Sequence, residues 1–434
     1  MHKHYWKNWS GNQACEPIYF HRPETVEEII KIVSQARQRG QCIRVVGAGH
    51  SWSPLVATSD HLISLDKHNR ILNVDRQELT VTVQAGIRLY QLNAQLAQYG
   101  LALSNLGTID QQSLAGVIST GTHGSGINYG IIATQVVDLE LITGRGEIVY
   151  CDKEQNPDIF YAALCGLGSL GVISTVTIRC EMAFNLHCVE EKVPLDYMLN
   201  NLESLIQNNE HFKFYWIPYA NVCLTFSLNR TKQPVQRPQV RKLVDHYVAR
   251  NLAYDSVCRL GSCFKGYIPT FNRLLTKFAA TRAEYVDVSH SAFCFPIYMK
   301  HWESEYAIPV ENTVQTFCEL REFIEGNDLP VNMTMEYRFA NEDEIWLSPA
   351  YRRKSCFVDA IQHCSLPYEG YFRGVDQLLR KQKARPHWGK LHYKTSDELA
   401  TLYPAWPQFL EVRHRLDPDN VFMNPYLEEL LGPE

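Results

Sequence analysis

The most informative stretch of the sequence is Ser113-Leu114-Ala115-Gly116 followed by Ser119-Thr120-Gly121-Thr122-His123-Gly124-Ser125-Gly126. Few structural roles need so many small, hydrogen-bonding residues in succession. A cofactor threaded along the backbone is one such role, because glycine lets the chain approach it closely. A long surface loop is the alternative, although loops of this length are uncommon in compact domains unless they are functional.

A second glycine turn lies upstream at Gly47-Ala48-Gly49-His50-Ser51, directly after a predicted strand over 42–46. Successive N–H groups in such a turn form a nest for an anion, so the turn is typical of phosphate binding. Trp52 and Pro54 depart from a Rossmann fingerprint, and an ordinary tight turn remains the alternative.

A third glycine run, over 166–171, spells G-x-G-x-x-G. A predicted helix precedes this run and a predicted strand follows it, which is the reverse of the order in a dinucleotide-binding turn. We therefore reject an NAD-binding Rossmann interpretation for both of these glycine segments.

Composition excludes several classes of protein. The 434 residues are 45% apolar and 21% charged, which is typical of a globular chain of two to three domains. With 42 basic and 47 acidic residues the net charge is −5, so nucleic-acid binding is not expected. The basic stretch over 237–277 is interrupted by acidic residues and glycines, and we interpret it as a solvated surface.

Cysteine usage and hydropathy bear on location. The 13 cysteines include no C-x-x-C pair, so neither a zinc site nor a disulfide framework is predicted, and scattered thiols indicate a reducing compartment. No apolar run reaches the length of about 18 residues that suggests a transmembrane helix. No secretory signal is seen at the N-terminus, so the sequence predicts a cytoplasmic location without a transmembrane segment.

The first 180 residues alternate between helical and extended patterns. Helices are predicted over 25–40, 89–100 and 156–164, and strands over 42–46, 61–65, 79–85, 135–142, 147–150 and 172–179. After about residue 182 the sequence becomes rich in aromatic residues with mixed periodicity, which indicates a second domain of α+β type. A final segment from Arg385 has its own motif and a helix ending near Arg415.

The ordered motifs together resemble a known family. They comprise G-A-G-H-S (47–51), S-N-L-G (104–107), S-L-A-G (113–116), T-G-T-H-G (120–124), G-L-G-S-L-G-V-I (166–173), E-Y-R-F (336–339), H-W-G-K (387–390), L-D-P (416–418) and F-M-N-P-Y-L (422–427). Over nearly its whole length the chain resembles the sugar-1,4-lactone oxidase branch of the vanillyl-alcohol-oxidase flavoprotein family.

The resemblance implies an α+β flavoprotein of two domains. Residues 1–182 would form an FAD-binding domain from two small α/β subdomains, and 183–384 a substrate domain whose antiparallel sheet roofs the flavin. Residues 385–434 would return to the flavin site and close it. By position, the cofactor-binding residues would be Val46, Gly47, Ala48, Gly49, His50, Ser51, Ser113, Gly116, Ser119, Gly121, Thr122, His123, Gly124, Ile173 and Lys390.

In this family the histidine of the first glycine turn carries FAD covalently through the C8-methyl carbon, which implies the same for His50. A neutral imidazole can add at that electrophilic position, and the tether raises the reduction potential of the flavin. The alternative is a turn histidine that bonds its own backbone.

The resemblance also implies catalytic roles. Arg338 and Lys390 would stabilise the negative charge that forms near flavin N1 and C2=O, while Glu336 would accept hydrogen bonds from substrate hydroxyls. His387 would orient the substrate or take the hydroxyl proton. A solvated surface pair is the alternative for Glu336 and Arg338, and a packing histidine beside Trp388 is the alternative for His387.

Ser113 and Gly107 complete the implied catalytic set. Oxidases of this branch tend to carry glycine at the position of Gly107, where dehydrogenases carry alanine, because oxygen needs a small void beside the flavin. The alternative is that Gly107 serves only a turn with positive φ.

The implied reaction transfers a hydride from C2 of a sugar lactone to flavin N5 and then passes two electrons to O2, giving H2O2. From L-gulono-1,4-lactone the product would tautomerise to ascorbate. An alditol oxidase acting on open-chain polyols and a catalytically silent flavin-binding module are the alternatives. No metal ligands are predicted.

Overall fold

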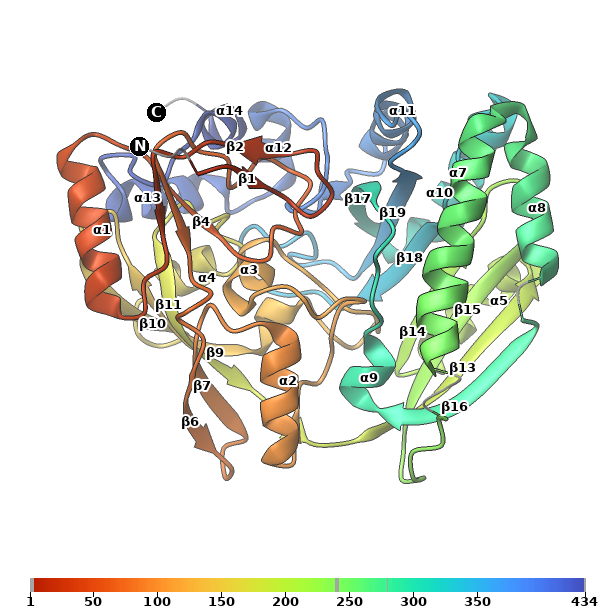
Figure 1. The fold of residues 1–434 in the computed structure, drawn as a ribbon, viewed down its shortest axis with the longest axis horizontal. Coiled ribbons are helices and arrows are strands. Elements are labelled where there is room, and N and C mark those ends of the chain that lie inside the picture. Colours follow the sequence, from red (N-terminus) through yellow and green to blue (C-terminus); the bar gives the residue numbers. More distant parts are fainter. Residues whose placement is uncertain (1–3, 239–241, 279, 433–434) are drawn as a thin grey trace.

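The computed structural model describes residues 4–238, 242–278 and 280–432. Two sheet-containing halves lie side by side (Figure 1). Residues of both halves line one cavity. Helices and sheets are mixed, and the sheet of the second half is antiparallel, so the predicted α+β class is confirmed.

The chain begins with a small parallel sheet in the order β3-β5-β4. Helix α1 starts at its N-cap Thr25, whose hydroxyl accepts a hydrogen bond from the Glu28 amide, and packs its apolar stripe against this sheet. The bounds are Tyr19–His21 for β3, Val26–Gln38 for α1, Ile43–Val46 for β4 and His61–Ser64 for β5, while β1 (Trp6–Lys7) pairs with β2 (Ala14–Cys15).

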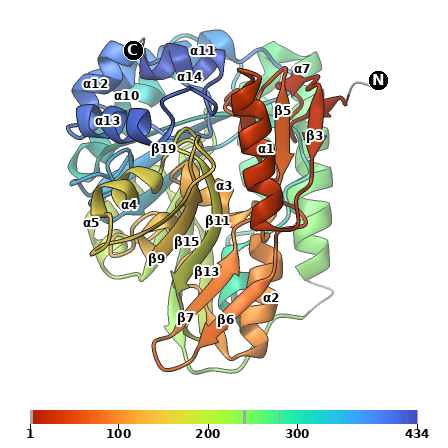
Figure 2. The same ribbon diagram turned by 90° about the vertical axis from the view of Figure 1, so that its left-hand side faces the viewer.

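A five-stranded antiparallel sheet completes the first half, in the order β10-β9-β11-β7-β6 (Figure 2). Its strands are β6 (Ile71–Asp75), β7 (Thr80–Gln84), β9 (Val136–Ile142), β10 (Ile148–Asp152) and β11 (Val172–Arg179). Helices α2 (Leu89–Gln98), α3 (Leu114–Ser119) and α4 (Pro157–Ala163) accompany it, with the 3-10 turn η1 (Ile132–Gln135) and the short pair β8 (Leu101–Ala102) and β12 (Glu181–Met182).

The predicted elements of this half agree with the structure to within about two residues at most ends, and the strand–helix order around each glycine run is as expected. The structure adds helix α3 inside the glycine-rich stretch. This helix was not predicted, because its apolar face contains only three residues among many small ones: Leu114, Val117 and Ile118.

The second half is built on an eight-stranded antiparallel sheet in the order β16-β13-β15-β14-β18-β19-β17-β20. Its strands are β13 (Asn185–Pro194), β14 (His211–Trp216), β15 (Val222–Thr231), β16 (Arg282–Val288), β17 (His301–Pro309), β18 (Met335–Ala340), β19 (Ser355–His363) and β20 (Arg385–Pro386). Helices α5 (Leu195–Gln207), α10 (Thr313–Gly326) and α11 (Glu369–Arg380) contribute their apolar faces to the same core as one face of this sheet.

Apolar and charged residues alternate along the central strands. Because successive side chains point to opposite faces, the sheet has one apolar face and one charged face. On β14, Phe212 and Phe214 belong to the core that includes those helices, whereas Lys213 is bonded to groups at the cavity. Strands β17, β18 and β19 follow the same rule, so the sheet lays a charged roof over the cavity.

The last segment joins the two halves. Strand β20 pairs with β17, and α12 (Ser396–Leu402), α13 (Trp406–Leu416) and α14 (Pro425–Leu431) then pack against the core of the first half. The motif residue Asn424 caps α14 and donates to the carbonyls of Pro54 and Ala57. Asp417 accepts from the amides of Val421 and Phe422. These contacts explain both C-terminal motifs as anchors of the tail.

Helices also occupy most of the basic stretch over 237–277, of which 239–241 lie outside the described residues. The π-helix η2 (Val244–Ala253) and α7 (Tyr254–Cys263) run together, and η3 (Lys265–Tyr267) leads into α8 (Ile268–Phe278). Their outer surface exposes several large apolar side chains, so the expected solvated surface is less polar than predicted: Val244, Tyr247, Val248, Leu252, Leu260, Phe264, Tyr267 and Leu274. Among the described residues, no helix is both long and apolar enough to cross a bilayer.

The remaining short helices are α9 (Ser289–Phe293) and η4 (Val310–Asn312).

Candidate active site

The cavity between the two halves has a volume of about 770 Å³ and collects most of the predicted site residues. Its lining includes Val46, Gly47, Ala48, Gly49, His50, Ser51, Gly107, Ser113, Gly116, Ser119, Thr122, His123, Ile173, Glu336, Arg338, His387 and Lys390. Gly121 and Gly124 do not line it. Gly121 turns the chain with a φ of +70° against Pro349, and Gly124 is packed so tightly that an added Cβ would lie 2.2 Å from Asn105 Oδ1.

The first glycine turn has the form of a cradle. A Cβ on Gly47 would lie 2.2 Å from Ser113 Oγ, and Gly49 has a φ of +68° that a side chain would strain. Ser113 Oγ accepts a hydrogen bond from the Gly116 amide and so caps α3. The structure therefore places Ser113 against the glycine cradle, where it fits a cofactor-binding role, and not with the charged side chains of the roof.

Arg44 holds the three segments that surround this cradle together. Its buried guanidinium donates to the carbonyls of Leu55, Leu167, Gly168 and Phe422. Positive φ angles at Leu167 and Gly168 turn the carbonyls of the third glycine run toward Arg44. This bonding explains why the run is rich in glycine. Sequence analysis missed Arg44, because a single arginine in a strand carries no motif.

His50 is enclosed by aromatic rings and cations. Trp9 stacks on its imidazole at a centroid distance of 5.3 Å, and Lys300 lies 4.0 Å above the Trp9 ring. Burial lowers the pKa of His50 to about 4, and the nearby charges of Lys300 and Arg88 add to this effect. The ring is therefore neutral at pH 7.

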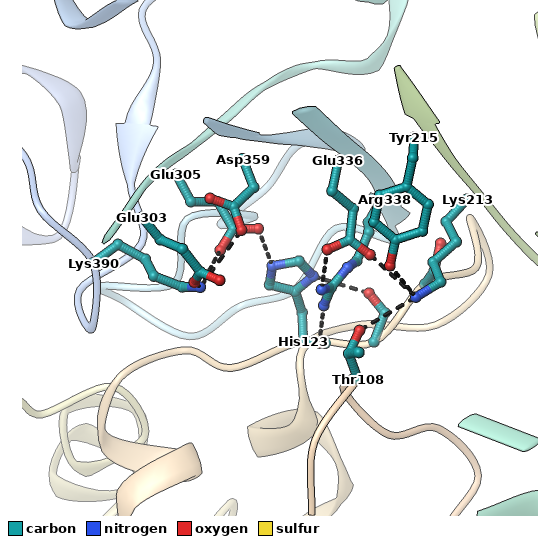
Figure 3. Close-up of polar contacts among 12 residues, drawn as sticks. Thr108, His123, Lys213, Tyr215, Glu303, Glu305, Glu336, Arg338, Asp359 and Lys390 are labelled. Carbon is teal, nitrogen blue, oxygen red and sulfur yellow. Dashed lines mark hydrogen bonds and ion pairs between the residues drawn. The ribbon is translucent and has the colours of Figure 1, made fainter. Parts of the chain in front are cut away.

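Glu336 and Arg338 lie on the cavity face of β18, where Glu336 is buried and Arg338 mostly buried, so the alternative of a solvated surface pair is wrong. Arg338 donates to Glu336 Oε2 at 2.5 Å, and Lys213 Nζ lies 3.1 Å from Glu336 Oε1 (Figure 3). Lys213 also donates to Thr108 and Tyr215. Burial raises the pKa of Glu336, but Arg338 and Lys213 outweigh burial and hold it well below its ordinary value.

Lys390 lies at the other end of the roof, among three acidic side chains. Its Nζ contacts Glu303 and lies 3.5 Å from Asp359 and 3.7 Å from Glu305. Burial alone would lower the pKa of Lys390 to about 7. The carboxylates of Glu303 and Glu305 lie within 4 Å and act in the opposite direction, and we take Lys390 to be charged.

His123, Glu305 and His387 form a buried cluster whose potential ligand atoms lie within 4.8 Å of one another. His123 Nε2 lies 2.9 Å from Glu305 Oε1, while its Nδ1 bonds the Gly124 carbonyl and so must be protonated. His387 Nδ1 accepts the Gly389 amide, which puts the proton of this neutral ring on Nε2. A metal ion at Nε2 of His387 would require the ring proton to move to Nδ1, which could then no longer accept the Gly389 amide. The cluster is therefore better suited to holding protons than a metal ion.

His387 faces the cavity and is not a packing residue of Trp388, whose indole donates to the Leu347 carbonyl on the other side. Burial lowers the pKa of His387 to about 4. Because its Nε2 already carries a proton, His387 can donate a hydrogen bond to a substrate oxygen but cannot take the hydroxyl proton at that atom.

Sequence analysis missed Thr108, Lys213, Tyr215, Glu303 and Glu305 at or beside the cavity, and Asp359, which lies behind it in the roof. A signal for most of them is present, since Lys213, Glu303, Glu305 and Asp359 are charged residues in strands whose alternate positions are apolar. Such a pattern marks a strand with one face in a core and the other at a polar site.

The fold and this site define a flavoprotein oxidoreductase. A model of an FAD binding domain matches residues 17–152, and a model described as D-arabinono-1,4-lactone oxidase matches residues 176–430. The glycine cradle, the neutral His50 and the two roof cations fit FAD as the cofactor.

Curated relatives cover nearly the whole chain. An L-gulono-1,4-lactone dehydrogenase of Mycobacterium tuberculosis is 35% identical over 99% of both chains, and an L-gulonolactone oxidase of Scyliorhinus torazame is 36% identical over 98% of this chain and 97% of its own. A D-arabinono-1,4-lactone oxidase of Eremothecium gossypii is 40% identical over 96% and 93% of the two chains. The chain belongs to the D-arabinono-1,4-lactone oxidase family.

The fold itself resembles that of a solved structure, cholesterol oxidase from B. sterolicum, with a TM-score of 0.84 at 16% identity over 99% of this chain and 97% of that chain.

Proposed function

We propose that this protein oxidises aldono-1,4-lactones such as L-gulono-, L-galactono- or D-arabinono-1,4-lactone at the C2 hydroxyl, with O2 as electron acceptor. The observation that carries the proposal is the buried, cation-flanked Glu336–Arg338 pair, which faces the same cavity as the His50 cradle. Membership of a family whose relatives are named for sugar lactones supports the substrate class.

When bound, FAD supplies the atom that accepts the substrate hydride and later the electrons that convert O2 to H2O2. The chain's own groups prepare the site for this chemistry. Arg338 and Lys390 provide fixed positive charge with little exposure to solvent, where it stabilises developing negative charge more effectively than at the open surface. Glu336 is ionised and accepts hydrogen bonds from substrate hydroxyls, and His387 Nε2 donates one to a substrate oxygen.

A substrate panel tests the proposal. The purified holoprotein is expected to lose its yellow colour anaerobically with an aldono-1,4-lactone and to release H2O2 when air is admitted. Alditols such as xylitol serve as the comparison, and faster bleaching with them would make the protein a polyol oxidase. If no lactone or alditol bleached the flavin, the protein would be a silent flavin-binding module.

His50 is proposed to carry FAD covalently, because its neutral ring can attack the C8-methyl position. We expect the flavin to remain with the polypeptide after acid denaturation of the wild-type protein and to separate from it in His50→Ala. His50→Ala should still bind some FAD, since the Gly47–Gly49 cradle is unchanged. His21→Ala, in the same half but outside the cavity, is the control and should retain bound flavin. Release of all flavin from the wild type would refute the linkage.

A further inference from the structure

Three carboxylates form a row across three neighbouring strands of the roof. Asp359 on β19 is the direct register partner of Glu305 on β17 and of Glu336 on β18. All three side chains point to the cavity side of the sheet and are almost fully buried, with exposed fractions of 3% for Glu305, 2% for Asp359 and 4% for Glu336. Figure 3 shows Asp359 between the two glutamates.

Such a row is unfavourable if all three groups are ionised, because like charges directly opposite on paired strands repel and burial removes the screening by water. The two outer members have their own partners. Glu336 is paired with Arg338 and Lys213, and Glu305 is bonded to His123.

The central member lacks such a partner. The cation in contact with Asp359 is Lys390, at 3.5 Å, and Lys390 is shared with Glu303 and Glu305. Among the described residues, Asp359 Oδ1 is buried without a hydrogen-bond partner. An ionised carboxylate in this position would be both repelled and poorly solvated.

We propose that Asp359 is held as a neutral carboxylic acid between the ionised Glu305 and Glu336, so that no third adjacent negative charge builds up in the roof. Asp359 does not line the cavity, so it acts through these neighbours and is a positioning residue.

The electrostatics agree with this geometry. Burial raises the pKa of Asp359 well above its ordinary value, Glu305 and Glu336 raise it further, and Arg338 acts in the opposite direction. The titratable groups around Asp359 on the cavity side are Glu303 and Glu305 on β17, Glu336 and Arg338 on β18, and Lys390 after β20. Tyr371 on α11 lies in the core on the other face of the sheet, and its pKa is raised by Asp359.

The neutral form has a functional consequence, which rests on the proposed function. With Asp359 protonated, the ionised carboxylates of the roof are those of Glu303, Glu305 and Glu336, which contact Lys390, His123 and the Lys213–Arg338 pair respectively. Ionisation of Asp359 would add a negative charge beside the groups that stabilise negative charge during the reaction.

Stability against pH tests the protonation state without substrate. The variant Asp359→Asn keeps the shape and the hydrogen-bonding capacity of a neutral acid. Asp359 stays protonated to a higher pH in the folded protein than in the unfolded chain. Its contribution to the free energy of unfolding is therefore complete below the pKa of the unfolded chain and is lost as pH rises toward the pKa of the folded state. As pH rises from 5 to 9, the folding equilibrium constant of Asp359→Asn holoprotein should therefore increase relative to that of the wild type, by up to about tenfold per pH unit.

Asp376 provides a matched control, since it is a buried aspartate of the same half that contacts Tyr306, Arg380 and Lys394. Burial raises the pKa of Asp376, but the Tyr306 hydroxyl and the two cations outweigh burial and hold it below its ordinary value. The contribution of Asp376 to the free energy of unfolding is complete above the pKa of the unfolded chain. Asp376→Asn should therefore be less stable than the wild type by the same amount at every pH from 5 to 9. Parallel stability curves for Asp359→Asn and the wild type would overturn the proposal.

Activity gives an independent readout. At pH 7 we expect kcat/KM of Asp359→Asn for the lactone to stay within about threefold of the wild type, and its decline at high pH to be weaker. A loss of 100-fold or more at pH 7 would show that an ionised Asp359 is required and would overturn the proposal. If no lactone is oxidised, the stability comparison still decides the protonation state, so the two proposals fail separately.

Discussion

Replacement of Arg338 by alanine is expected to slow reduction of the flavin by the lactone about 10²- to 10³-fold, which corresponds to about 3–4 kcal/mol of lost transition-state stabilisation. The guanidinium is mostly buried, and burial lowers the pKa of Arg338. The Glu336 carboxylate outweighs burial and holds this pKa above its ordinary value, so the positive charge is permanent. Stopped-flow absorbance under anaerobic conditions measures the rate directly.

Two further variants show whether charge alone is sufficient. Arg338→Lys keeps the charge but loses the planar fork that reaches Glu336 and the His123 carbonyl, so it should also be slow. Arg353→Ala removes another mostly buried arginine, which bonds the Ala307 and Lys383 carbonyls outside the cavity. This control should lower stability but leave the reduction rate near that of the wild type. Wild-type reduction in Arg338→Ala would refute the assigned role.

The first half of the fold was predictable because local rules act there without competition. The stripe of α1 begins at a threonine cap, and strands such as β7 alternate between buried and half-buried positions in the ordinary way. Its glycine turns were also recognisable, since Gly47 and Gly49 are needed by local geometry.

The second half was predictable only as a class, because its organisation depends on contacts between distant strands. Strand β18 pairs with β14, which lies over 100 residues earlier, so the row of carboxylates across β17, β19 and β18 exists only in the folded sheet. No spacing along the chain brings Glu305, Asp359 and Glu336 together. Within β18, by contrast, the spacing of Glu336 and Arg338 was sufficient to place both side chains on one face.

Glycine density alone did not separate residues that touch the cavity from residues that shape the backbone around it. Gly116 lines the cavity, whereas Gly121 is required by a left-handed turn and Gly124 by close packing against Asn105. All three look alike in sequence. Whether a position requires glycine depends on the backbone angle and on the atoms that a Cβ would contact, which only the structure shows.

Gly107 poses the same question with a functional outcome. It lines the cavity, its φ lies outside the left-handed region, and an added Cβ would lie 3.4 Å from the His123 carbonyl oxygen and 3.7 Å from Thr122 Cγ2. These are ordinary contact distances, so the alternative that Gly107 serves only a turn with positive φ is wrong. The structure accepts alanine here, and the effect of the methyl group on oxygen access can be measured.

We expect Gly107→Ala to leave flavin reduction by the lactone nearly intact and to slow reoxidation by O2 at least about tenfold, a rise of about 1.4 kcal/mol in that barrier. The physical reason is steric, since one methyl group can fill the small void that oxygen needs. Artificial acceptors that react at the flavin edge should still work. Gly370→Ala, where a Cβ would meet nothing within 4 Å, is the matched control and should change neither half-reaction. Stopped-flow measurement separates the two steps: reoxidation in air at the wild-type rate would eliminate the gating role of Gly107, and equal slowing of both steps would indicate a disturbed site.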